Sequence, residues 1–181
     1  MVEGTITCMK KRTAIIGAFV SLLPLGQPLL MGGGIVLTST AVMLSVPAKV
    51  NAESASYYYN RGNDKLNTGD YYGAIADYNR AIELNPRNAD AYINRGVAKR
   101  KLEDYYGSIA DYSKAIEINP RDADAYYNRG NAKYDLDDYY GAIADYNRAI
   151  EINPSKANAY NNRGNAKYDL DDYYGAIADY N

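Results

Sequence analysis

The sequence of 181 residues contains no histidine, no tryptophan, one cysteine and one phenylalanine. Histidine is the commonest general base near neutral pH and a frequent metal ligand, so its absence excludes Ser–His, Cys–His and histidine–metal mechanisms. A single cysteine excludes an internal disulfide and a zinc site made of several cysteines. The formal net charge of −2 gives no electrostatic reason to expect a nucleic acid as partner. A mechanism based on carboxylates alone survives these exclusions.

Tyrosine, in contrast, is abundant, and its distribution divides the chain into two parts. All 21 tyrosines lie at position 57 or later, whereas Phe19 lies before them. Residues 1–52 are apolar and interrupted by glycine and proline, and residues 53–181 are charged and periodic. We therefore expect a leader over 1–52 and a separate domain over 53–181.

The leader has the layout of a secretory signal peptide. The basic cluster Lys10-Lys11-Arg12 precedes a segment without charge, Thr13 to Ala48, and Val50-Asn51-Ala52 follows it. A basic region, an apolar region and a small-x-small site in this order are typical of a signal that is cleaved on export. The pattern predicts cleavage before Glu53 and a product exported to a periplasm, a lumen or the cell exterior. Because Met9 adjoins the basic cluster, the true start is either Met1 or Met9.

An uncleaved membrane anchor is the alternative for this leader. The uncharged segment 13–48 is longer than the apolar region of an ordinary signal, about 7 to 15 residues. Pro24, Pro28 and Gly32-Gly33-Gly34 divide it into pieces shorter than the roughly 20 residues that cross a bilayer. Cleaved signal, membrane tether with the repeats exported, and a leader without a targeting role all remain open.

The second part is an internal repeat with a period of 34 residues. Glycines recur at this spacing, as do aspartates that are each followed by Tyr-Tyr-Gly. The aspartates are Asp70, Asp104, Asp138 and Asp172, and the glycines are Gly62, Gly96, Gly130 and Gly164. A fixed period of this length is the signature of a repeat architecture. The units are 55–88, 89–122 and 123–156, with a partial fourth unit over 157–181.

Each unit is expected to form two helices. Asn88 and Asp122 are positioned to cap first helices that run to Leu102 and Leu136, with Leu170 as the equivalent in the fourth unit, and the four periodic aspartates are positioned to cap second helices. Each second helix should end at Asn-Pro, because proline disfavours helix in the residue before it. Helices of about 14 residues are marginal alone in water, so stacking of units must stabilise them.

Small residues at Gly130, Ala142 and Ala149 and large residues such as Tyr126 and Tyr146 recur in register with the period. This pattern resembles the tetratricopeptide repeat family, in particular bacterial members with an N-terminal signal sequence. The resemblance implies an all-α, right-handed superhelical solenoid of antiparallel helix pairs, with a concave face lined mainly by first helices. It also implies a non-enzymatic scaffold that binds proteins or peptides.

Two recurring features of the unit need a structural reason: the arginine before the signature glycine and the glycine after Asp-Tyr-Tyr. The family often has leucine one residue before the signature glycine, where this chain has Arg61, Arg95, Arg129 and Arg163. We expect the arginine stem to pack while the guanidinium reaches a carboxylate. Candidate carboxylates are Asp77, Asp111 and Asp145. The glycines after Asp-Tyr-Tyr lie inside the second helix, and the sequence gives no reason for them.

The resemblance places a peptide-binding groove along one face of the first helices. The candidate residues are Tyr59, Asn63, Ile93, Val97, Arg100, Tyr127, Asn131, Tyr134, Asn161, Asn165 and Tyr168. Asparagine can pair with both peptide N–H and C=O groups, and tyrosine offers a rigid surface with a polar tip. A grip on a partner's terminal carboxylate is not favoured, because Arg100 and Lys101 are the only basic candidates. Alternatively, these residues are the consensus of the unit and bind no ligand.

No catalytic residue, metal site or cofactor is predicted. The acidic pairs Asp137-Asp138 and Asp171-Asp172 are interpreted as turns, in which one aspartate caps a helix and the other is solvated. The rival to a groove-binding adaptor is a structural repeat block of a larger protein. Self-association through the fourth unit is a form of this rival, since Ile177 and Tyr180 should lie near an uncovered end.

Overall fold

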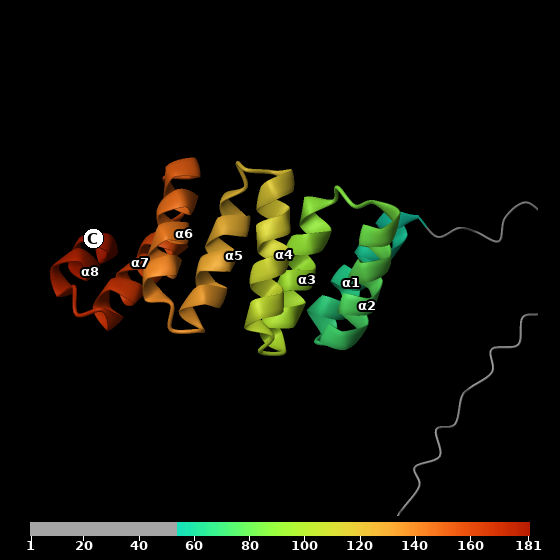
Figure 1. The fold of residues 1–181 in the computed structure, drawn as a ribbon, viewed down its shortest axis with the longest axis horizontal. Helices are drawn as coiled ribbons and strands as arrows, with labels where there is room; N and C mark the ends of the chain where they lie inside the picture. The colour runs from blue at the N-terminus through green and yellow to red at the C-terminus, as the bar shows by residue number, and fades with distance from the viewer. Residues whose placement is uncertain (1–53) are drawn as a thin grey trace, which may run out of the picture. The chain divides into compact units, whose positions relative to one another are not determined.

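The computed structural model describes residues 54–181, and every structural statement below concerns that part of the chain. It contains helices and no strands there. The helices are α1 (Ala55–Thr68), α2 (Tyr71–Leu84), α3 (Ala89–Lys101), α4 (Tyr105–Ile118), α5 (Ala123–Tyr134), α6 (Tyr139–Ile152), α7 (Ala157–Asp169) and α8 (Tyr173–Tyr180). Successive helices form pairs that stack along one direction (Figure 1). The predicted all-α solenoid of helix pairs is confirmed.

The predictions for the leader are not addressed by this structure. The signal or anchor over 1–52 and the cleavage site before Glu53 lie outside the described residues. Within residues 54–181, none of the helices combines the length and apolar character that crossing a bilayer requires.

The predicted helix caps are present. The Oδ1 atom of Asp70 accepts a hydrogen bond from the Gly73 backbone N–H at 2.9 Å, and the other three units repeat this contact. Asn88 and Asp122 cap α3 and α5 in the same way. The expected ends of the first helices were wrong by one or two residues. The helices α3, α5 and α7 stop at Lys101, Tyr134 and Asp169, because the chain turns there through a left-handed residue.

The cap explains the glycine inside each second helix. A Cβ atom at Gly73 would lie 2.0 Å from Oδ2 of Asp70, and the glycines of the other units would meet their own aspartates at 2.1 Å. The capping carboxylate therefore occupies the volume that a side chain at this position would need. Glycine costs up to about 1 kcal/mol in a helix interior, and this cost is offset by the cap, typically about 1 kcal/mol.

Close packing of the two helices in a unit depends on a second glycine. A Cβ at Gly130 would lie 2.7 Å from Cε1 of Tyr146, and Gly62 and Gly96 lie equally close to Tyr78 and Tyr112. These three tyrosines are completely or almost completely buried. The predicted small residues Ala142 and Ala149 are also fully buried. The small-large pattern thus reflects one aromatic ring per unit that lies against a bare helix backbone.

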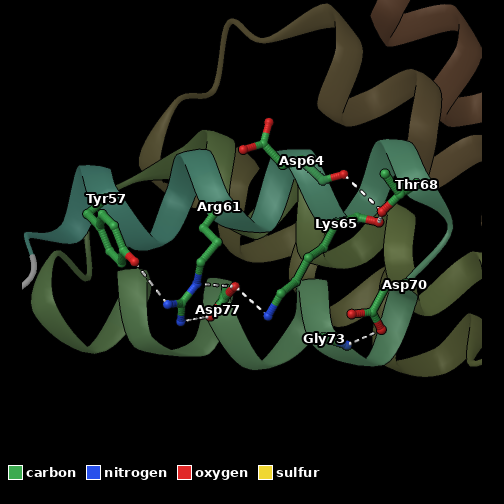
Figure 2. Close-up of polar contacts among 8 residues, drawn as sticks. All are labelled: Tyr57, Arg61, Asp64, Lys65, Thr68, Asp70, Gly73 and Asp77. Carbon is green, nitrogen blue, oxygen red and sulfur yellow. Dashed lines mark hydrogen bonds and ion pairs between the residues drawn. The ribbon is translucent and has the colours of Figure 1, made fainter.

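An ion cluster joins the two helices of every unit, as Figure 2 shows for the first. The Nε and Nη2 atoms of Arg61 bind Asp77 at 2.8 and 2.5 Å, and Nζ of Lys65 binds the same carboxylate at 2.9 Å. The equivalent clusters are Arg95–Asp111–Lys99, Arg129–Asp145–Lys133 and Arg163–Asp179–Lys167. The predicted pairing of the arginines with Asp77, Asp111 and Asp145 is confirmed. The lysine, four residues after the arginine, was not foreseen.

The buried aspartate is kept charged by this arrangement. The bidentate hydrogen bond from Arg61 lowers the pKa of Asp77 below its usual value, although burial of the carboxyl opposes this. Burial likewise raises the pKa of Asp179, but hydrogen bonds from Arg163 and Lys167 outweigh it and the net shift is downward. The arginines thus replace an apolar contact between the helices with a paired charge.

Candidate peptide-binding groove

A pocket of about 280 Å³ lies along the first helices of the second, third and fourth units. Its lining comes from α3, α5, α6 and α7, with one residue from the turn after α5. The residues are Arg100, Tyr127, Asn131, Tyr134, Asp135, Tyr146, Asn162 and Asn165. The structure therefore brings together five of the predicted groove residues, from three different units.

The other six predicted residues lie outside this pocket. Tyr59 and Asn63 are half-buried at the joint between the first and second units. Ile93 is buried and Val97 packs against it in a core cluster. Asn161 borders a separate hollow beside the end of α8. Tyr168 is exposed, and its ring packs edge-on against Tyr173.

The charged groups of the pocket neutralise one another. Arg100 forms a bidentate ion pair with Asp135, in which Nη2 lies 3.1 Å from Oδ1. The Tyr134 hydroxyl donates to Asp169, and this hydrogen bond raises the pKa of Tyr134 to about 12. At neutral pH the pocket thus presents a guanidinium, a carboxylate and protonated phenols. A ligand carboxylate would compete with Asp135 for Arg100.

The polar floor of the pocket is a hydrogen-bonded group of four side chains. The Oδ1 atom of Asn131 accepts from the Tyr146 hydroxyl and from Nδ2 of Asn162, each at 2.8 Å. Asn162 also donates to the Tyr127 hydroxyl at 3.1 Å. Asn131 is buried, and its Oδ1 atom is used within the protein. Asn165 is exposed at the surface of the pocket. We call this group the polar joint of units 3 and 4.

The joint of units 1 and 2 has the same construction. Asn63 accepts from Tyr78 at 2.8 Å and from Asn94 at 2.9 Å, and Asn94 also donates to Tyr59. Tyr59 and Asn63 therefore have the same contacts as Tyr127 and Asn131, but Leu66 stands where the later unit has Tyr134.

The joint of units 2 and 3 is different. Ile93 and Val97 occupy the positions of the tyrosine and asparagine, so no acceptor is present there. The Tyr112 hydroxyl is buried and has no hydrogen-bond partner among the described residues. Burial raises the pKa of Tyr112, which keeps this phenol neutral. We call this the apolar joint.

Three lining residues were missed by the sequence reasoning: Asp135, Tyr146 and Asn162. A signal for Asn162 was available, because Asn60, Asn94, Asn128 and Asn162 recur one residue before the periodic arginine. Asp135 also recurs, as Asp169, but its partner Arg100 lies 35 residues earlier in the preceding unit, and the pattern within one unit does not show this contact.

Solved structures share this fold. The crystal structure of MamA is similar with a TM-score of 0.69 and 24% identity, over 72% of this chain and 76% of that one. The first TPR of Spaghetti (RPAP3), bound to the HSP90 peptide SRMEEVD, has a TM-score of 0.64 and 27% identity, over 67% of this chain and 97% of that one. The Arabidopsis OM64 TPR domain has a TM-score of 0.63 and 28% identity, over 65% and 97%. No curated protein matches the chain.

The family model described as TPR repeat matches residues 62–102, 98–137 and 130–171, which is more than half of the chain. Its repeats are commonly modules of protein–protein interaction, and such proteins are generally scaffolds and not enzymes. The chain belongs to the TPR repeat family.

Proposed function

We propose that this protein is a non-enzymatic adaptor that binds an extended peptide of a partner protein along the groove stripe of its first helices. One observation carries the proposal. The scaffold positions are identical in all four units, namely the arginine, the glycine and the tyrosine over it, and the paired aspartate. The groove positions vary from unit to unit, for example Tyr59, Ile93, Tyr127 and Asn161. A surface that differs on a repeated scaffold is suited to recognising one sequence.

The chemistry of the pocket favours binding over catalysis. Asp135 is held by Arg100, and Asp169 accepts from Tyr134, so neither carboxylate is free to act as a base. The side chains that remain available offer amide hydrogen bonds, aromatic surface and a guanidinium. The related RPAP3 domain was solved with a bound peptide, which supports a peptide as the ligand class.

Affinity capture with the full chain from its native host, read by mass spectrometry, tests the proposal. The groove variant carries Arg100→Gln and Asn165→Ala, two changes in the pocket lining. The control variant carries Tyr140→Ala, a strongly exposed residue outside the pocket. We expect the groove variant to lose at least tenfold in partner recovery and the control to retain it. Equal recovery by both variants would move the contact to an end or edge of the array.

A structural role is the second candidate, favoured by one observation. Ile177 and Tyr180 of α8 are exposed, whereas the corresponding residues of the earlier units are covered. A repeat block that stacks against another protein, or against a second copy, through α8 would use this surface. In that case the groove variant would leave all partner contacts unchanged.

We also propose that the array is exported, by cleavage of the leader or with the leader retained as a membrane tether over 13–48. The support is the basic cluster before the uncharged segment and the small-x-small site after it. N-terminal sequencing of the protein recovered from its host distinguishes the cases. Cleavage predicts Glu53 as the first residue, and retention predicts Met1 or Met9.

A further inference from the structure

Three tyrosines at the starts of second helices have strongly exposed rings. Tyr72, Tyr106 and Tyr140 are the second residues of α2, α4 and α6, and they are 77%, 78% and 76% exposed. Within residues 54–181 their side chains make no hydrogen bond, ring contact or ion pair. Packing of the array therefore gives no reason for an aromatic residue at this position in each of the three full units.

The three rings lie along one edge of the array. Each follows the turn that joins the two helices of its unit, and the turns between α3 and α4 and between α5 and α6 lie on the lower side of the stack in Figure 1. The turns between α2 and α3 and between α4 and α5, which join successive units, lie on the upper side in the same view. We call the edge that comprises residues 69–72, 103–106 and 137–140 the tyrosine edge.

The tyrosine edge carries carboxylates and no cation of its own. The charged residues in its three ranges, all of them exposed, are Asp70, Glu103, Asp104, Asp137 and Asp138. Three of these carboxylates cap helices through backbone N–H groups, Asp137 accepts from the Tyr139 hydroxyl, and within the described residues none of the five forms an ion pair. The neighbouring Lys101 is exposed and forms no ion pair in that part of the chain either. The edge thus presents negative charge together with its exposed rings.

Carboxylates and tyrosine rings together hold cations elsewhere in this molecule. The guanidinium of Arg129 donates through Nε to Asp145 at 2.9 Å, and its Cζ atom lies 5.6 Å from the centre of the Tyr126 ring. Arg95 and Arg163 are held in the same way by the aspartate and the tyrosine of their own units, with Cζ atoms 5.3 and 5.2 Å from the ring centres. The tyrosine edge offers both kinds of group, and no cation of the described residues is bound there.

We propose that the tyrosine edge is a second binding surface, which docks an arginine-rich segment of a partner protein. Its carboxylates attract a cationic segment, and each exposed ring offers a face on which a guanidinium can stack. Because the same groups recur once per unit, basic residues spread along one segment can engage several units at once. Nucleic acids and anionic lipid surfaces carry the same sign of charge as the edge and are repelled by it. The edge is distinct from the groove, and the proposal does not rest on the groove's function.

Fluorescence anisotropy with the full chain tests the proposal. The probe is a fluorescein-labelled peptide of alternating arginine and serine, and the control probe has glutamine in place of arginine. The ring variant carries Tyr72→Ser, Tyr106→Ser and Tyr140→Ser, so it loses the three rings and keeps every carboxylate. An exposed cation–π contact contributes a factor of about two to five in affinity, so the ring variant should bind the arginine probe at least tenfold more weakly. Equal affinity of the two proteins would mean attraction to negative charge alone, and equal affinity for the two probes would mean that no cation is recognised; either result would overturn the proposal.

Two matched variants fix where and how the probe is held. Tyr72→Phe, Tyr106→Phe and Tyr140→Phe together keep the rings, so the affinity should stay within about twofold of the original. Asn165→Ala changes the groove without altering a charge, and it should also leave the affinity unchanged. A phenylalanine variant as weak as the ring variant would assign binding to the hydroxyls, and an equal loss in Asn165→Ala would place the probe in the groove; both results contradict the proposal. A groove partner should in turn be retained by Tyr140→Ala, because that change removes one ring of the edge and none of the pocket lining.

The basic cluster of the leader is another source of cations for this edge. Lys10→Gln, Lys11→Gln and Arg12→Gln in the full chain remove these charges. If the edge serves a partner protein, this variant should bind the arginine probe as the original chain does. Binding that is about tenfold tighter in the variant would assign the edge to the chain's own leader, which acts as a tethered competitor, and would overturn the proposal.

Discussion

The polar joint of units 3 and 4 and the apolar joint of units 2 and 3 have the same backbone architecture and opposite polar chemistry. In the polar joint, Asn131 accepts hydrogen bonds from Tyr146 and Asn162. In the apolar joint, Val97 stands at the asparagine position and the Tyr112 hydroxyl is buried without a partner. An unmade hydrogen bond on a buried group costs about 1 to 3 kcal/mol. The array thus tolerates a local defect at the apolar joint.

The contrast indicates which contacts of the repeat are kept at every joint and which vary. The glycine-tyrosine contact and the arginine-aspartate-lysine cluster are present on both sides of each joint. The differences fall at two positions of the first helix, where Ile93 and Val97 replace the tyrosine and asparagine of the other two joints. Repeat proteins are stabilised by the sum of units and neighbouring interfaces, so one weaker joint is offset by the others.

The largest effect should come from breaking the polar joint. Asn131→Val would copy the apolar joint and leave the Tyr146 hydroxyl and one bond of Asn162 unmade. We expect the free energy of unfolding to fall by about 2 to 3 kcal/mol, measured by urea denaturation. Asn165→Val is the control, because its partner Tyr180 is exposed and can bond to water. Equal losses in both variants would show that burial of the tyrosine does not decide the cost.

Removal of the tyrosine hydroxyl should have opposite signs at the two joints. Tyr146→Phe loses a hydrogen bond and should lower the free energy of unfolding by about 1 kcal/mol. Tyr112→Phe removes a buried hydroxyl that has no partner and should raise it by about 1 kcal/mol. Thermal or urea unfolding of the two variants side by side gives the comparison. A loss of stability in Tyr112→Phe would mean that its hydroxyl is satisfied in solution.

The apolar joint should also be repairable. Val97→Asn places an acceptor where Asn63 and Asn131 bind their tyrosines at 2.8 Å. We expect a gain of about 1 kcal/mol from the new bond to Tyr112. Asn128 is the sequence equivalent of Asn94 and Asn162, which donate to the asparagine at the polar joints. The gain should vanish in a Tyr112→Phe background, and this double-mutant cycle is the control. A gain that persists there would have another cause.

The fold and the groove were predictable from the sequence to different degrees. The period, the caps and the arginine-aspartate pairs repeat in every unit, so the pattern of residues alone identified them. The pocket also depends on Arg100, at a position that holds Leu66, Tyr134 and Tyr168 in the other units. Arg100 pairs with Asp135 of the next unit, as Tyr134 pairs with Asp169, and such contacts between units cannot be read from the pattern within one unit. The glycine after each Asp-Tyr-Tyr was recognised as a regularity, but its reason is a contact of 2.0 to 2.1 Å that needs coordinates.

The smallest effect concerns the turn between the helices of a unit, and it separates backbone strain from the chemistry of the joints. Gly69 has a φ of 82° in the first unit, while Glu103 in the second has a φ of 62°. A left-handed conformation costs an ordinary residue about 1 kcal/mol. Asp137, the equivalent residue of the third unit, also has a positive φ of 59°, and its side chain accepts a hydrogen bond from the Tyr139 hydroxyl. Glu103→Gly should therefore raise the free energy of unfolding by about 0.5 to 1 kcal/mol. The hydrogen bonds of Glu103 in the described residues are to Arg100 and Tyr105 and do not involve Val97 or Asn131, so the effects of the joint variants should be unchanged in the Glu103→Gly background. Effects that shrink in that background would mean that strain in the turn and the defect at Tyr112 are coupled.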